Sequence, residues 1–311
     1  MTEMVTYQHS YGKAYIPVYR FSARPLTGLS PIPESSFTGR TNMAFFHEVD
    51  LEVFGERFLR SYTDGDNRDV IATDSMKNFI LRHSLDFDGA TQEAFLFFLG
   101  SAFLKTYQHV EHVRLTAREI PFVPLTVPQN GQFVSSTIAF AASPGAYATA
   151  TLALARDGGH TLVTEHQCGY VNQLLMKLSG SAFTGFIRDD YTTLPETRDR
   201  PLAIKLDVFW QYQTADDLLA PDHGRYVAAE QVRDLTRAVF ASYTSESIQQ
   251  LVHEMGMHIL ERFPQLRSVH LVAENRTRQI IAESTTDPMV KVCSDPFPAY
   301  GVIRLTVQRA V

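Results

Sequence analysis

The segment Val70–Asn78 carries the clearest potential for chemistry, because an apolar run stops at Thr73-Asp74-Ser75 and a helical pattern begins there. Thr, Asp and Ser side chains commonly cap a helix, since their oxygens accept hydrogen bonds from unpaired backbone N–H groups. The same N–H groups, with the partial positive charge of a helix start, can bind an anion. The segment alone leaves two interpretations open: a simple cap, or a reactive Thr73 beside a bound anion.

A second candidate is the aromatic and basic segment Phe183–Arg200. An aromatic face can stack on a flat ring, and a guanidinium can bind a planar anion through two parallel hydrogen bonds. The competing interpretation is a solvated loop with local ion pairs.

Two shorter segments offer hydrogen-bonding groups. Ser247-Ile248-Gln249 opens another helical pattern, and the Gln249 amide carries both a donor and an acceptor, which suits a lactam-type edge. Asn275-Arg276-Thr277 follows a strand pattern. Taken locally, an ordinary surface Gln and an ordinary turn are the favoured interpretations of these two segments.

The histidines do not predict a metal site. His109 and His112 fall in a strand-like region, where this spacing points the rings to opposite faces. His253 and His258 are spaced differently from the two ligands of a His-Glu-x-x-His zinc helix. No Cys-x-x-Cys pair and no phosphate-binding glycine loop is found. We therefore expect neither a metal nor an organic cofactor.

The composition is that of an ordinary globular protein, with 311 residues, 44% hydrophobic and 20% charged. A net charge of −6 argues against nucleic-acid binding. The densest apolar run, residues 94–104, is too short to cross a membrane. No secretory signal or peroxisomal address is visible, and two cysteines, Cys168 and Cys293, suit a reducing compartment, although a disulfide between them stays open. We expect a cytoplasmic protein.

The order of predicted elements repeats on either side of Asp157-Gly158-Gly159. Each half, residues 1–157 and 158–311, predicts two strands, two helices and two strands. This order favours an α+β fold in which each half is an antiparallel sheet with helices on one face. The predicted helices span residues 74–83, 91–107, 228–243 and 247–263; Pro144-Gly145 marks either a hairpin turn or a break in a long strand.

Taken together, these motifs resemble the cofactor-independent urate oxidase (uricase) family over nearly the whole chain. The matching segments are Tyr11-Gly12-Lys13, Val70–Asn78, Tyr107–Val110, Phe183–Arg200, Trp210–Tyr212, Ser247–Gln249 and Asn275. The resemblance implies two tandem tunnelling-fold halves per chain, and four chains that form a homotetrameric barrel with active sites between subunits. It also implies a reaction: urate, molecular oxygen and water give 5-hydroxyisourate and hydrogen peroxide.

The resemblance further implies roles for individual residues. Lys13 and Thr73 resemble the catalytic dyad that takes a proton from the substrate, and Asp74 would bind the substrate through its backbone N–H. Phe183 would stack on the purine, Arg200 would bind one edge, and Gln249 with the Ile248 backbone would bind the other. Asn275 would hold oxygen or water above the ring.

One position departs from the family pattern, because Thr277 stands where the family usually has a histidine. Thr277 could hold a water molecule but cannot titrate near neutral pH. Two alternatives therefore stay open: another purine- or pterin-processing enzyme of the tunnelling fold, and a non-catalytic purine-binding protein with that fold.

Overall fold

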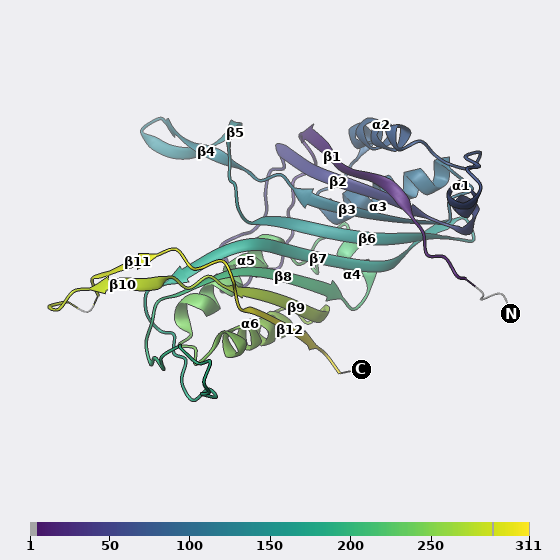
Figure 1. Ribbon diagram of the computed structural model, residues 1–311. Helices are drawn as coiled ribbons and strands as arrows, with labels where there is room; N and C mark the ends of the chain where they lie inside the picture. The colour runs from purple at the N-terminus through teal and green to yellow at the C-terminus, as the bar shows by residue number, and fades with distance from the viewer. Residues whose placement is uncertain (1–4, 288, 311) are drawn as a thin grey trace.

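The computed structural model describes residues 5–287 and 289–310. Its main element is an eight-stranded antiparallel sheet with the strand order β1-β2-β3-β6-β7-β8-β9-β12 (Figure 1). The first half of the chain supplies β1 (Tyr11–Phe21), β2 (Ala44–Phe54), β3 (His112–Glu119) and β6 (Tyr147–Asp157). The second half supplies β7 (His160–Lys177), β8 (Leu202–Tyr212), β9 (Leu266–Asn275) and β12 (Val302–Gln308).

The helices occupy the same place in each half. Between β2 and β3 lie α1 (Leu59–Thr63), α2 (Thr73–His83) and α3 (Gln92–Thr106), together with the 3₁₀ turns Glu56–Phe58 and Ser84–Asp86. Between β8 and β9 lie α4 (Ala215–Leu219), α5 (Ala229–Ser242) and α6 (Ile248–Arg262). The four predicted helices are confirmed to within two residues at each end. The short helices α1 and α4 were not predicted, because five residues are too few to show a helical period.

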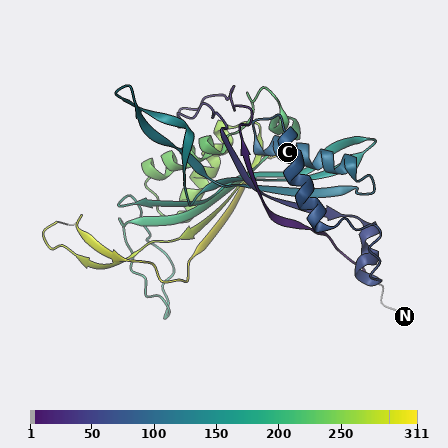
Figure 2. The ribbon, with the colours of Figure 1, turned by 90° about the horizontal axis from the view of Figure 1, so that it is seen from above.

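Two hairpins project from the main sheet, β4 (Phe122–Gln129) with β5 (Gln132–Ala142), and β10 (Gln279–Glu283) with β11 (Lys291–Ser294) (Figures 1 and 2). Each hairpin is inserted before the last strand of its half. Only Ile120 and Pro121 separate β3 from β4, yet these two strands belong to different sheets. Pro144-Gly145 is a break and not a hairpin turn, since β5 pairs with β4 whereas β6 joins the main sheet.

The hydrophobic core lies on one face of the sheet. Alternate residues of β2, such as Val49 and Leu51, are buried, and they belong to one core cluster with Leu99 of α3 and Met255 of α6. The other face carries polar and charged side chains, as in the ion pair between Arg118 and Asp50 at 2.6 Å. The helices therefore cover one face, as the sequence predicted.

The two halves share a single sheet, to which each half supplies four antiparallel strands. After the Gly158-Gly159 turn, β7 pairs directly with β6, beginning at His160 opposite Asp157. The shared sheet is not closed, because β1 and β12 are its two edges. Within the described residues, no helix is both long and apolar enough to cross a bilayer.

A β-bulge occurs at the same place in each half. In β1 the register shifts after Lys13, Tyr15 has a φ of 56°, and its N–H donates to Asp50 Oδ1 at 2.8 Å. In β7 the register shifts after Tyr170, Asn172 has a φ of 63°, and its N–H donates to Asp207 Oδ1 at 2.6 Å. In both halves, 35 positions separate the bulged residue from the carboxylate that holds it.

Candidate active site

Phe183 and Arg200 are held together by paired backbone segments. The N–H of Phe183 donates to the Thr197 carbonyl at 2.7 Å, and the N–H of Thr197 donates back at 3.0 Å. The N–H of Arg200 donates to the Ser181 carbonyl at 2.8 Å. As a result, the Arg200 guanidinium carbon lies 5.6 Å from the centre of the Phe183 ring, within the range of a cation–π contact.

The Arg200 side chain is partly withdrawn from water. Its Nε is buried and has no hydrogen-bond partner among residues 5–287 and 289–310. Burial also lowers the pKa of Arg200 from its ordinary value. A buried cation with an unsatisfied donor gains from a planar anion that accepts two hydrogen bonds.

The start of α6 adjoins the same segments. The Ala182 N–H donates to the Ser245 carbonyl at 2.8 Å, and Ser245 donates to the Gly180 carbonyl at 3.2 Å. Two residues later Ser247 caps α6, where its hydroxyl accepts the Gln250 N–H at 3.1 Å. Ile248 and Gln249 form the first turn, with Ile248 buried and Gln249 exposed.

Asp199, which the sequence indicated only as a loop charge, anchors the turn behind Arg200. Its carboxylate accepts the Gly180 N–H at 2.7 Å and the Ser179 hydroxyl at 2.9 Å. The Gly180 hydrogen bond is the largest cause of the lowered pKa of Asp199. A carboxylate that accepts backbone N–H bonds is typical of a structural turn. The sequence alone did not reveal this role of Asp199, because it depends on the position of Ser179 and Gly180 in the fold.

Asn275 and Thr277 reach this region from β9. The Asn275 Oδ1 accepts the Thr277 N–H at 3.0 Å, and the Thr277 hydroxyl accepts the Ala203 N–H at 3.3 Å. Ala203 lies on β8, shortly after Arg200 in the chain. After the role that the resemblance implies for most of them, we name these residues of the second half the purine-edge cluster: Phe183, Arg200, Ile248, Gln249, Asn275 and Thr277.

Lys13, Thr73 and Asp74 form a separate group, the dyad cluster, in the first half. The Tyr11 hydroxyl accepts the Ile71 N–H at 2.8 Å and so ties β1 to the segment before α2. The Asp74 carboxylate accepts Lys77 Nζ at 2.6 Å. The pKa of Asp74 is lowered chiefly by this Lys77 hydrogen bond and, to a smaller extent, by the charge of Lys13. The strand that carries Lys13, β1, is in contact with α2.

The start of α2 is open, which corrects the interpretation of Thr73-Asp74-Ser75 as a cap. The N-cap residue is Ala72, whose side chain cannot accept a hydrogen bond, and Thr73 is the first residue of the helix. The N–H groups of the first turn are consequently free of any side-chain cap, unlike those of α6. An uncapped helix start can bind an anion or a polar group.

The two clusters lie far apart on one chain. β1 forms one edge of the sheet and β9 is next to the opposite edge, six strand steps away (Figure 1). At about 4.8 Å between neighbouring strands, six steps correspond to about 29 Å. The structure therefore brings Phe183 to Arg200 and Asn275 to Thr277, but it does not bring the dyad cluster to the purine-edge cluster within one chain.

The family model described as Uricase matches residues 34–149 and 166–287, which is most of the chain. The chain belongs to the uricase family. A uricase from Haloferax volcanii is 47% identical over 270 residues, which cover 86% of this chain and 88% of that protein. A uricase from Halalkalicoccus jeotgali is 44% identical over 301 residues, covering 97% and 98%. The crystal structure of urate oxidase from Bacillus sp. TB-90 has a TM-score of 0.94 to this structure at 42% identity, covering 97% of this chain and all of that one.

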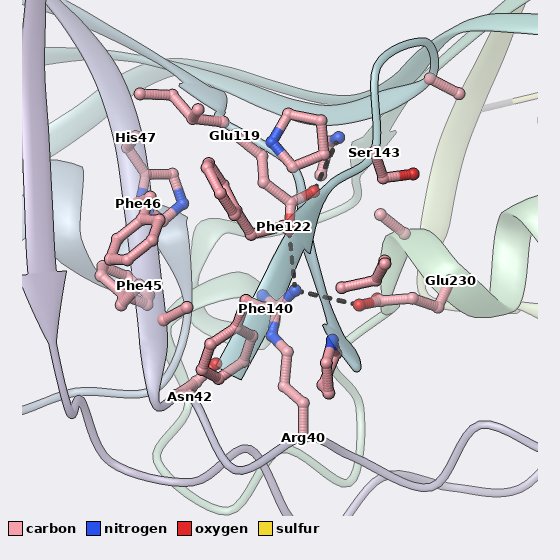
Figure 3. A pocket seen from close by; sticks show the side chains of 18 of the residues that line it. Arg40, Asn42, Phe45, Phe46, His47, Glu119, Phe122, Phe140, Ser143 and Glu230 are labelled. Carbon is pink, nitrogen blue, oxygen red and sulfur yellow. Dashed lines mark hydrogen bonds and ion pairs between the residues drawn. The ribbon is translucent and has the colours of Figure 1, made fainter. Parts of the chain in front are cut away.

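This member of the uricase family also has a cavity of about 470 Å³ that contains none of the predicted site residues (Figure 3). It lies between the base of the β4–β5 hairpin and α5, and its lining includes Phe46, Phe122 and Phe140. Arg40 Nη1 lies 2.9 Å from Glu230 Oε1 and 3.6 Å from Glu119 Oε1, so the cavity's central charges pair with each other. No sequence motif marks this cavity, because its lining is drawn from both halves.

No metal-ligand cluster is found in this uricase chain, as far as residues 5–287 and 289–310 are concerned. His109 precedes β3 instead of lying in a strand, and its Nε2 is 3.0 Å from the Asp69 carbonyl oxygen. His258 Nδ1 is 2.8 Å from the Glu254 carbonyl oxygen on the same helix. Cys168 is buried and Cys293 is exposed, and both are free thiols. The two cysteines therefore do not form a disulfide with each other.

Proposed function

We propose that this chain catalyses the oxidation of urate by molecular oxygen and water to 5-hydroxyisourate and hydrogen peroxide, without a metal or an organic cofactor. The observation that carries the proposal is the uricase family match, which extends over both halves of the chain. The relatives named uricase also align over most of their own length.

Substrate binding is assigned to the purine-edge cluster. Phe183 stacks on the flat ring of urate, and the partly buried Arg200 guanidinium donates two hydrogen bonds to one polar edge. Gln249 offers a donor and an acceptor to the opposite edge, with the Ile248 backbone beside it. The backbone N–H of Asp74, at the uncapped start of α2, donates to the same anion.

Proton transfer is assigned to Lys13 and Thr73. The Thr73 hydroxyl accepts the substrate proton as it passes its own to Lys13, which acts as the base. The deprotonated, electron-rich ring then gives two electrons to oxygen. Oxygen takes up two protons to become hydrogen peroxide, and the oxygen atom of water adds to the oxidised ring as a hydroxyl group. Asn275 holds oxygen or water above the ring.

We also propose that the active site is shared between subunits of a homotetramer. The separation of the dyad cluster from the purine-edge cluster supports this arrangement, since a second chain is needed to join them. The open edges β1 and β12 present unpaired backbone groups suited to pairing with further strands in a barrel. In this proposal residues 1–157 and 158–311 are two tunnelling-fold halves, and the enzyme works in the cytoplasm.

The test is to incubate the metal-stripped protein with urate and oxygen, and to follow urate by its ultraviolet absorbance and peroxide by a coupled assay. We expect urate to disappear and peroxide to form in equal amounts. Absence of urate decay would refute the proposal and favour a non-catalytic purine-binding protein. Decay that requires added metal would indicate a different mechanism.

A further inference from the structure

We propose that Thr277 is a positioning residue that fixes Asn275 as a hydrogen-bond donor and couples it to the strand following Arg200. The inference rests on the proposed function, because it assigns Asn275 to the oxygen or water site. It also gives Thr277 a role different from the proton relay of the histidine usual at this position.

The orientation of the Asn275 amide follows from its neighbours. Its Oδ1 accepts the backbone N–H of Thr277 at 3.0 Å, while the backbone N–H of Asn275 donates to the Gly301 carbonyl at 2.8 Å and holds the residue in place. An Asn side chain has one acceptor oxygen and one NH₂ donor group. With the oxygen committed to the turn, the Nδ2 group is the part of Asn275 that can serve a ligand. Asn275 therefore donates to an oxygen atom above the ring.

The Thr277 hydroxyl is committed to β8. It accepts the Ala203 N–H at 3.3 Å and lies 3.5 Å from the Ala203 carbonyl oxygen, to which it can donate. The Arg276 N–H donates to the same carbonyl at 2.8 Å. The hydroxyl thus uses its proton and one lone pair on the Ala203 backbone, so its proton is committed to a backbone carbonyl and not to a substrate.

The same contacts link two parts of the purine-edge cluster. Ala203 follows Pro201 and Leu202 directly after Arg200, and Ile204 is paired with Asn275 across the β8–β9 ladder. A shift of the Asn275 turn relative to β8 would therefore change the distance between the oxygen site and the Arg200 guanidinium. This predicts that loss of the Thr277 hydroxyl affects both substrate affinity and turnover.

The first experiment compares wild type, Thr277→Val and Thr277→Ser in steady-state urate oxidation. Val keeps the shape but leaves the Ala203 N–H unpaired, so kcat/KM should fall about tenfold, with contributions from both kcat and KM. Ser keeps the hydroxyl and should restore kcat/KM to within about twofold of wild type. The pH dependence of kcat should keep its shape in all three. Thr164→Val is the matched control. The Thr164 hydroxyl on β7 also donates to a backbone carbonyl of a neighbouring strand, that of Ala153 on β6, at 3.1 Å. This pair lies outside the purine-edge cluster.

The second experiment tests the donor role with Asn275→Asp, which keeps an oxygen for the Thr277 N–H but loses the NH₂ donor. We expect kcat to fall about 100-fold or more, as on removal of one donor to a developing charge, with the thermal midpoint of unfolding unchanged. Retained activity in Asn275→Asp would show that Asn275 acts as an acceptor and would overturn the inference. An unchanged Thr277→Val enzyme, or a Thr277→Val pH profile with a lost limb, would overturn the positioning role alone. A wild-type protein that leaves urate intact would refute the proposed function and this inference with it.

Discussion

Gly12 and Leu51 approach so closely that a β-carbon on Gly12 would lie 2.0 Å from the Leu51 carbonyl oxygen. Gly12 pairs with Glu52 across the β1–β2 ladder and directly precedes Lys13. The position of Lys13 therefore depends on the absence of a side chain at its neighbour.

We predict that Gly12→Ala displaces β1 from β2, because the contact is with backbone that cannot rotate away. The free energy of unfolding should fall by about 1–3 kcal/mol, as in overpacked sites, and kcat should fall as well because Lys13 moves. Thermal unfolding and urate turnover measure the two effects. Gly224→Ala is the control, since a β-carbon there meets no atom within 4 Å.

Replacing either member of the proposed dyad should slow the reaction without unfolding the protein. Lys13→Met and Thr73→Val should each lower kcat by about 10²- to 10⁴-fold, the usual size of a general acid–base contribution. Size-exclusion chromatography should show an unchanged assembly. Lys105→Met, at an exposed lysine near the end of α3, should leave kcat as it is. Wild-type turnover in both dyad variants would disprove the assignment.

Two inactive variants should restore each other if the active site is shared between chains. In a pair of one Lys13→Met chain and one Arg200→Ala chain, one shared site carries both defects and the other carries neither. Random pairing in co-expressed protein should therefore give about a quarter of wild-type activity, by the symmetry of a two-fold pair. If each chain held a complete site, the mixture would stay inactive. The measurement is kcat per subunit, with each variant expressed alone as the baseline.

His47 should make folding sensitive to mild acid. Burial, and secondarily the charge of Arg40, lowers its pKa from 6.5 to about 3. The unfolded chain therefore takes up a proton first as the pH falls, so the stability from neutral His47 is complete above pH 6.5 and is lost as the pH falls towards 3. At pH 5 the loss should be about 2 kcal/mol. His47→Leu should remove this part of the pH dependence in denaturant titrations at pH 7 and pH 5, whereas a substitution at the exposed His160, His160→Gln, should not.

The parts of the fold that were predictable are those with a local signal. The helices at residues 92–106 and 248–262 begin at Thr91 and Ser247, whose hydroxyls cap them as their sequences indicate. Every second residue of β8 from Ile204 to Tyr212 is apolar, and this alternation matches the buried face of the strand. The continuity of the sheet across Gly158-Gly159 was not predictable, because it depends on pairing between long strands and not on either strand's own pattern.

The candidate site shows the same limit. The residue types of the purine-edge cluster were visible in the sequence, but their grouping depends on backbone contacts such as Ala182 to Ser245, which no side chain reveals. At α2 the local pattern led to a wrong prediction of the helix cap. Thr73 has a hydroxyl that could cap the helix, but the N-cap residue is Ala72 and Thr73 is already the first residue of the helix. The left-handed conformations of Tyr15 and Asn172 were also hidden, since neither position is a glycine.

The repeated bulge relates the cavity of Figure 3 to the dyad cluster. Tyr170 stands two residues before Asn172, as Lys13 stands two residues before Tyr15, and Glu230 lies in the first turn of α5, as Thr73 does in α2. Both Tyr170 and Glu230 line the cavity of Figure 3. Duplication of one module would give both halves the same bulge and the same helix start beside it. The cavity then stands in the second half where the dyad cluster stands in the first, and the ion pairs of Arg40 occupy it.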